Sequence, residues 1–187
     1  MMKHIFQTCI FAFLFSSISN AQEDSASISP RIRSAADSML SAFRQKDFRT
    51  FARFNNEKLL DMLGGAENFA TFMDQQMKSM EGIEFTVIRT GRIIRVTPYK
   101  DTWQCILEQQ TQISAQGTVV SSVTHLVGVS ANRGYSWRFI DANQGSPEQF
   151  RDIMPELNPA MLVPRKKQVS GQTLEEMLAG YQTTYSP

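Results

Sequence analysis

The sequence predicts one α+β domain: N-terminal helices packed on a curved antiparallel sheet of about four long strands, with a C-terminal helical tail. Apolar residues recur at helical spacing as far as Gly82, and they alternate at every second position from Ile83 to Asp141. Only short turns separate the alternating stretches, which indicates antiparallel neighbours because parallel strands need long crossovers. With 187 residues and 42% hydrophobic residues, the chain suits a single globular domain.

The first residues have the pattern of a secretory signal peptide. Lys3 precedes a mostly apolar run over residues 5–15, and Ser19 and Ala21 are small residues spaced for cleavage after Ala21. The run is shorter than the ~18 apolar residues that a membrane span needs, so we expect no stable membrane anchor after cleavage. The sequence therefore predicts a signal peptide at 1–21 and a secreted or periplasmic protein.

The helical part begins after a polar lead-in at residues 22–28, which we expect to be flexible. Ser29 and Pro30 are typical of a helix start, and Asp47 is placed to cap a second helical segment. Glycines end the later helices. The expected helical segments are 29–45, 47–63 with an interruption at 55–56, and 67–80.

The expected strands are 83–97, 102–114, 118–130 and 135–141, and Gly91 is the expected site of a bulge or bend. A short helix starts near Ser146. Residues 29–164 form the domain in this interpretation, and 165–187 form the tail. The tail begins with a basic run at 165–167, interpreted as a solvated patch. It continues with Thr173-x-x-Glu176, a capping box ahead of a short amphipathic helix.

Alternation assigns side chains to the two faces of each strand. In 118–130 the odd-numbered residues are the more apolar set, so we expect them to face the helices and to carry His125 inward. In 102–114 we likewise expect the odd-numbered residues to face inward. The residues expected to line a pocket there are Trp103, Cys105, Leu107, Val123, His125, Val127, Trp137 and Phe139 from the strands, and Phe69 and Met73 from the helices.

The order of elements resembles a known family. Helix 29–45, the Lys46-Asp47-Phe48 entry to the second helix, the long strands after Gly82 and the final stretch 135–141 are similar to the nuclear transport factor two-like superfamily, which has the cystatin-like α+β cone. The resemblance implies a pocket between helices and sheet. It leaves function open, because the superfamily includes isomerases, cyclases, dehydratases, transport adaptors and non-catalytic secreted domains.

Few residues suggest chemistry. His125 is the only histidine after signal cleavage and is the candidate acid or base, with Asp141 as its candidate partner. Cys105 is then the only cysteine, and we expect it to be inert packing. One histidine and one cysteine cannot supply a metal site of the usual nitrogen or sulfur ligands, and no phosphate-binding glycine motif is present. We therefore expect no cofactor.

Three functions remain open. The favoured interpretation is a non-catalytic domain that binds a small apolar ligand or a protein partner. One alternative is a small proton-transfer enzyme that uses His125 with Asp141. The other is a module that dimerises through its open sheet face or its tail helix. The net charge of +1 argues against nucleic acid as a partner.

Overall fold

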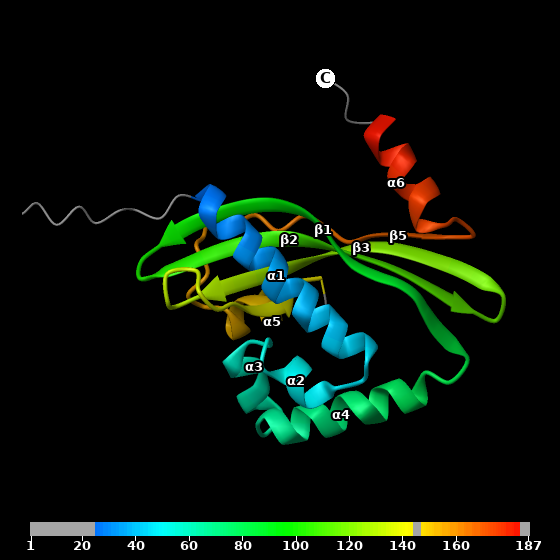
Figure 1. Cartoon of the computed structure of the whole chain (residues 1–187), viewed down its shortest axis with the longest axis horizontal. Helices are drawn as coiled ribbons and strands as arrows, with labels where there is room; N and C mark the ends of the chain where they lie inside the picture. The colour runs from blue at the N-terminus through cyan, green and yellow to red at the C-terminus, as the bar shows by residue number, and fades with distance from the viewer. Residues whose placement is uncertain (1–24, 144–146, 184–187) are drawn as a thin grey trace, which may run out of the picture.

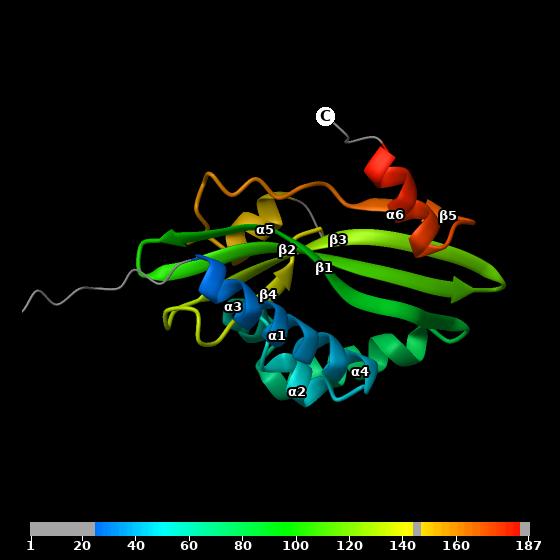
Figure 2. The ribbon, with the colours of Figure 1, turned by 45° about the horizontal axis from the view of Figure 1, so that its top comes forward.

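The protein is a curved five-stranded antiparallel sheet with N-terminal helices on one face and the C-terminal part of the chain on the other (Figures 1 and 2). The computed structural model describes residues 25–143 and 147–183. It confirms the predicted α+β fold with a curved sheet and a C-terminal helix. The signal peptide expected at 1–21 lies outside the described residues.

The second, third and fourth helices form close to where the sequence pattern places them, and capping side chains start two of them. Asp47 Oδ1 accepts a hydrogen bond from the Thr50 N–H at 3.1 Å, and Asn56 Oδ1 accepts one from the Leu59 N–H at 3.2 Å. These contacts fill backbone donors that a helix N-terminus leaves unpaired. The helices are Ser25–Arg44 (α1), Phe48–Ala52 (α2), Glu57–Met62 (α3) and Ala66–Ser79 (α4).

The prediction for the start of the first helix was wrong. Helix α1 begins at Ser25, so Ser29 is not its N-cap, Pro30 lies inside it, and the described end of the expected flexible lead-in is helical. Ile28 is fully buried and packs in the same core cluster as Trp137. Burial of this side chain outweighs the helix-start signal at Pro30, which costs the helix one backbone donor.

The sheet has three long strands and two short ones. Strand β3 pairs with β2 along its whole length, and its other edge pairs with β4 at one end and β5 at the other. The fourth strand is shorter than predicted, since Tyr135 precedes it and is 69% exposed. Sequence reasoning missed β5. The strands are Ile83–Tyr99 (β1), Thr102–Ala115 (β2), Thr118–Ser130 (β3), Arg138–Asp141 (β4) and Lys167–Ser170 (β5).

The two faces of the sheet carry two hydrophobic clusters. The inner face, which carries Leu107 and Leu126, packs against α1. The outer face, which carries Ile106 and Val127, packs against Phe150 and other residues of the C-terminal part. The predicted face of β3 was therefore wrong, because its odd-numbered residues are on the outer face. The physical reason is the register, which pairs Leu107 with Leu126 and so puts even-numbered β3 residues inward.

Strand β1 contains the predicted bulge. Its register against β2 shifts between Thr90 and Ile93, around Gly91. Two further shifts lie between Phe85 and Val87 and between Ile93 and Arg95. Such irregularities increase the local twist and bend a long strand, which fits the curvature of the sheet.

The C-terminal part returns to the outer face (Figure 2). Helix α5 (Pro147–Ile153) precedes an irregular stretch that leads to β5, and helix α6 (Leu174–Thr183) follows. The capping box is confirmed, since the Thr173 N–H donates to Glu176 Oε2 at 2.8 Å and the Glu176 N–H to Thr173 Oγ1 at 3.3 Å. Leu174 and Met177 are buried. None of the described helices is long and apolar enough to cross a membrane.

Candidate functional site

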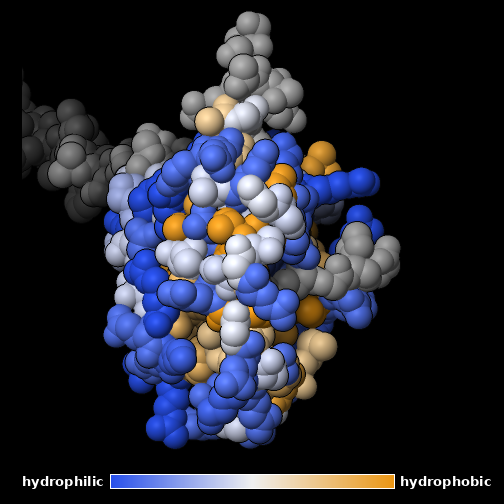
Figure 3. Space-filling model, turned by 90° about the vertical axis from the view of Figure 1, so that its right-hand side faces the viewer, coloured by the Kyte–Doolittle hydropathy of each residue, from blue (hydrophilic) through white to orange (hydrophobic). Residues whose placement is uncertain are grey.

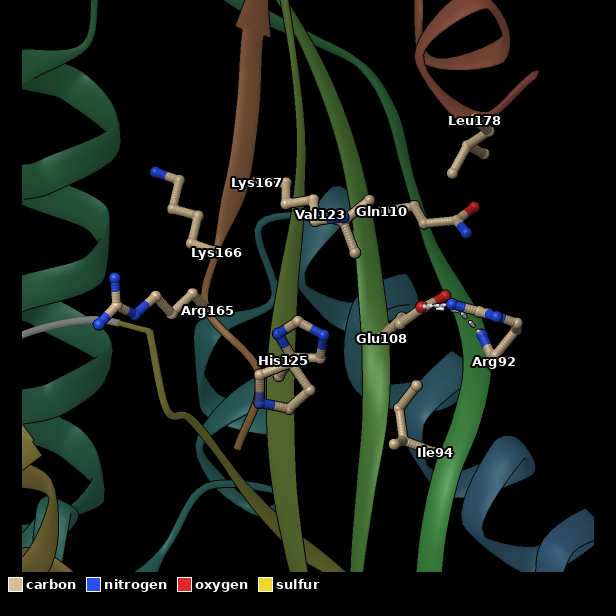
Figure 4. A pocket seen from close by; sticks show the side chains of 11 residues that line it. Arg92, Ile94, Glu108, Gln110, Val123, His125, Arg165, Lys166, Lys167 and Leu178 are labelled. Atoms are coloured by element: carbon tan, nitrogen blue, oxygen red, sulfur yellow. Dashed lines mark hydrogen bonds and ion pairs between the residues drawn. The ribbon is translucent and has the colours of Figure 1, made fainter. Parts of the chain in front are cut away.

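A groove of about 890 Å³ crosses the outer face of the sheet (Figure 4). Its floor comes from three adjacent strands, β1, β2 and β3, and its walls come from the stretch before β5 and from α6. The lining mixes charged, polar and apolar side chains. They are Arg92, Ile94, Glu108, Gln110, Val123, His125, Pro164, Arg165, Lys166, Lys167 and Leu178.

An ion pair between β1 and β2 lies in the floor. The Glu108 side chain is 5% exposed, and its carboxylate accepts hydrogen bonds from Arg92 Nη2 at 2.7 Å, from Arg92 Nε at 3.1 Å and from the Arg92 backbone N–H at 3.1 Å. The bulge at Gly91 permits this geometry. A Cβ on Gly91 would lie 2.7 Å from Glu108 Oε2, so any larger residue would collide with the carboxylate.

The ion pair determines the charge state of Glu108. Burial raises the pKa of the Glu108 carboxyl, but the hydrogen bonds and positive charge of Arg92 lower it by more, so the pKa lies below its ordinary value. Glu108 is therefore ionised at neutral pH, and its charge is already balanced within the groove.

His125 lies beside Glu108 on the neighbouring strand and is 3% exposed. Asn143 holds it. Asn143 Oδ1 accepts from the His125 backbone N–H at 2.6 Å, and Asn143 Nδ2 donates to the Pro164 carbonyl at 3.0 Å. Since a backbone N–H only donates and a carbonyl only accepts, these two bonds fix which end of the amide faces the histidine.

That orientation of the Asn143 amide shows which ring nitrogen of His125 carries the hydrogen. His125 Nδ1 lies 3.0 Å from Asn143 Oδ1, so Nδ1 carries a hydrogen and donates it. The neutral ring then has its lone pair on Nε2. No described residue offers Nε2 a hydrogen-bond partner, and His125 lines the groove, so this atom is available to a molecule bound there.

Gln110 offers a second available group. Its Oε1 accepts a hydrogen bond from Arg89 Nε at 3.0 Å. Because a guanidinium only donates, this bond shows which end of the Gln110 amide is the oxygen. Gln110 is 8% exposed, and its Nε2 has no hydrogen-bond partner among the described residues. The groove therefore holds two buried side chains, each with one nitrogen that forms no hydrogen bond to any of the described residues.

The basic run at 165–167 lies at the edge of the groove next to β3 (Figure 4). The sequence alone favoured a solvated patch for this run. All three side chains are exposed, yet all three line the groove, and Lys167 begins β5. Arg165 and Lys166 have no ion-pair partner in the described part of the chain.

The structure brings only two of the predicted pocket residues, Val123 and His125, into this groove. Val127 packs in the outer hydrophobic cluster, and Phe69 and Met73 pack among the helices. The other predicted residues lie in or against the inner hydrophobic cluster, where they pack beneath α1: Trp103, Cys105, Leu107, Trp137 and Phe139. Burial also raises the pKa of the Cys105 thiol, which suits the expected inert packing role.

The predicted pairing of His125 with Asp141 was wrong. Asp141 pairs with Leu126 in the sheet and so belongs to the inner face, opposite to His125. Its carboxylate accepts the Asn143 backbone N–H at 2.9 Å, which is a turn contact. Sequence reasoning missed Asn143. The only available signal was the Asp-Ala-Asn sequence at the end of a strand, which predicts a turn but not a partner for histidine.

Comparisons with protein-family models, with curated proteins and with solved structures gave no match. Within residues 25–143 and 147–183, no group of three or more His, Cys, Asp or Glu side chains is arranged to hold a metal ion. The function therefore has to be argued from the groove itself.

Proposed function

We propose that the protein binds a small, largely apolar molecule in the outer groove, without catalysis. The volume of the groove supports this proposal, since about 890 Å³ lies within the range of ligand sites in proteins, roughly 300–1,000 Å³. Ile94, Val123 and Leu178 supply apolar surface on three different elements. Ile94 is 41% exposed, so part of that surface is available for burial by a ligand.

A neutral fluorescent probe tests this function directly. N-phenyl-1-naphthylamine should gain fluorescence on binding the full chain, and Ile94→Ser should weaken its binding about fivefold, because loss of one apolar contact costs about 1 kcal/mol. Leu162→Ser is the matched control, since Leu162 is 83% exposed and does not line the groove. Absence of a fluorescence gain in the unmodified protein, or equal loss in both variants, contradicts the proposal.

One observation favours the second candidate function, proton transfer. Asn143 fixes the hydrogen of His125 on Nδ1 and leaves Nε2 towards the groove, which is how an acid or base histidine is oriented. Asn143 takes the orienting role first assigned to Asp141. Long-range proton–nitrogen NMR should show the neutral ring protonated on Nδ1, and a ring protonated on Nε2 removes this candidate.

Three further properties expected from the sequence are also proposals. Membership of the nuclear transport factor two-like superfamily, a signal peptide cleaved after Ala21, and dimerisation all stay predictions. Figure 3 shows apolar side chains among hydrophilic ones at the end of the molecule that carries the turn between β2 and β3. Sedimentation of the purified protein and N-terminal sequencing after expression in a secreting host test the dimer and the cleavage site.

A further inference from the structure

We infer that the molecule bound in this groove is an amphipathic anion, an apolar body with a single anionic group at one end. The inference rests on the proposed function and adds the chemical class of the ligand. The groove combines two cations, Arg165 and Lys166, without ion-pair partners among the described residues, two largely buried side chains that each have one nitrogen without a described partner, and apolar surface on the opposite side.

The charges of the groove are unbalanced. Four cationic side chains line it, against the single carboxylate of Glu108. That carboxylate is already occupied by three donors of Arg92, so it neither needs nor attracts a further cation. Arg165 and Lys166 have no carboxylate partner among the described residues, so the positive charge at the β3 side remains available to a bound anion.

The buried polar groups fit the same chemistry. Gln110 Nε2 carries hydrogens that no described protein group accepts, and it can only donate. His125 keeps its Nδ1 hydrogen on Asn143 in both charge states, so protonation adds a hydrogen at Nε2, towards the groove. With a hydrogen on Nε2, the ring can donate a hydrogen bond to an anionic oxygen in the groove. An ammonium can donate to the Nε2 lone pair of the neutral ring, but it gains nothing from Gln110 Nε2 and is repelled by Arg165 and Lys166.

The arrangement of these groups defines the orientation of the ligand in the groove. In Figure 4, Arg165 and Lys166 lie on one side of His125, and Ile94 and Leu178 lie on the other side, towards β1 and α6. Val123 lies between the two sides. The anionic group is therefore placed near Arg165 and His125, and the apolar body extends across the strands towards Ile94 and Leu178.

Matched ligands test the inference by displacement of bound N-phenyl-1-naphthylamine. Octanoate and octyl phosphate share the chain of octanol and octyltrimethylammonium but carry a negative charge. We expect octanoate to compete at least tenfold better than octanol, and octyltrimethylammonium to compete least. Added salt should weaken octanoate and leave octanol unchanged, because salt screens exposed charges. If octyl phosphate alone competes well, the anionic group is a phosphate, and if both anions do, the shared negative charge is recognised.

Variants locate the anionic group. Arg165→Gln with Lys166→Gln should weaken octanoate about fivefold to tenfold and leave octanol unchanged, a size expected for two exposed ion contacts. Lys46→Gln with Arg53→Gln makes the same change in net charge at exposed positions outside the groove and should change neither ligand. Octanol binding as tightly as both anions, or equal loss in the two double variants, overturns the inference.

The result separates failure of the inference from failure of the proposed function. Probe binding without preference for anions sinks the inference and keeps the groove as an apolar site. No probe binding contradicts the proposed function, and calorimetric titration of octanoate into the full chain then decides the inference by itself. Octanoate binding that is lost in the Arg165 and Lys166 double variant supports it, and absence of binding overturns it.

Discussion

Replacing Arg92 with glutamine should destabilise the protein by about 2 kcal/mol. The substitution removes two hydrogen bonds to the Glu108 carboxylate and leaves the one from the Arg92 backbone N–H. Removing one partner of a fully buried ion pair costs about 3–5 kcal/mol, and hydrogen bonds to charged groups contribute about 1.5–3 kcal/mol each. The Arg92 side chain is 70% exposed, so solvent screening reduces the loss below that of a fully buried pair, to about 2 kcal/mol.

The assay is urea unfolding of the full chain at several pH values. The pKa of Glu108 is lowered in the folded protein, so its stabilisation is present above the pKa of an unfolded glutamate, about 4.3, and is lost as pH falls through the folded value. In the variant, burial dominates and penalises the ionised carboxylate at neutral pH. The difference in unfolding free energy between the two proteins should therefore be largest near neutral pH and shrink below about pH 4.

Two further variants isolate the pair. Arg92→Gln combined with Glu108→Gln should recover part of the lost stability, because a neutral amide needs no counterion. Arg53→Gln, which removes an exposed charge without an ion pair in the described residues, should stay within about 0.5 kcal/mol of the original protein. A loss below about 0.5 kcal/mol for Arg92→Gln at neutral pH, or a loss that does not change with pH, refutes the reasoning.

Three further predictions concern packing, reactivity and capping. Gly91→Ala should lower the free energy of unfolding, measured in urea, by about 1–3 kcal/mol because its Cβ would lie 2.7 Å from Glu108 Oε2. Gly180 has open space around it, so Gly180→Ala should instead stabilise helix α6 by up to about 1 kcal/mol. In a Cys9→Ser variant, Cys105 should react with a thiol reagent only after unfolding, and fast reaction in the native protein contradicts its burial. Thr173→Ala should cost about 1 kcal/mol of local helix stability and speed amide exchange within α6, and unchanged exchange there contradicts a working capping box.

Most of the fold follows from the sequence because periodicity reports which surface an element buries. The strand 118–130 was predicted with the bounds that the structure shows, and the bulge at Gly91 was predicted from a glycine inside an alternating run. The short strand β5 could not be predicted. It is four residues long, and it forms because the edge of β3 beside it needs partners, which no local pattern reports.

The wrong assignment of the β3 faces could have been avoided, because the length of the turn before β3 already fixes its register against β2. Gln116 and Gly117 form a two-residue turn, so Ala115 pairs with Thr118. Each pair of this ladder then joins an odd-numbered residue of one strand to an even-numbered residue of the other. Taking both odd-numbered sets as inward violates that register, because directly paired residues share a face. Hydrophobicity alone favoured the wrong set, since both faces of β3 are covered.

The candidate site was less predictable than the fold. His125 and Val123 were singled out, but in an expected pocket on the opposite face. The groove depends on contacts between residues far apart in the chain, such as Asn143 with His125 and the wall at 165–167 beside β3. Such contacts come from tertiary arrangement, so composition and spacing do not report them.

Strand β5, beside the wall of the groove, is the last strand of the sheet in sequence order. Strand β5 contributes four residue pairs to β3, whereas the ladder between β2 and β3 has thirteen. The smaller ladder makes local opening of this segment less costly than global unfolding. Local opening can therefore leave the sheet and the N-terminal helices folded, and we expect amide exchange in β5 to be faster than at the centre of β3.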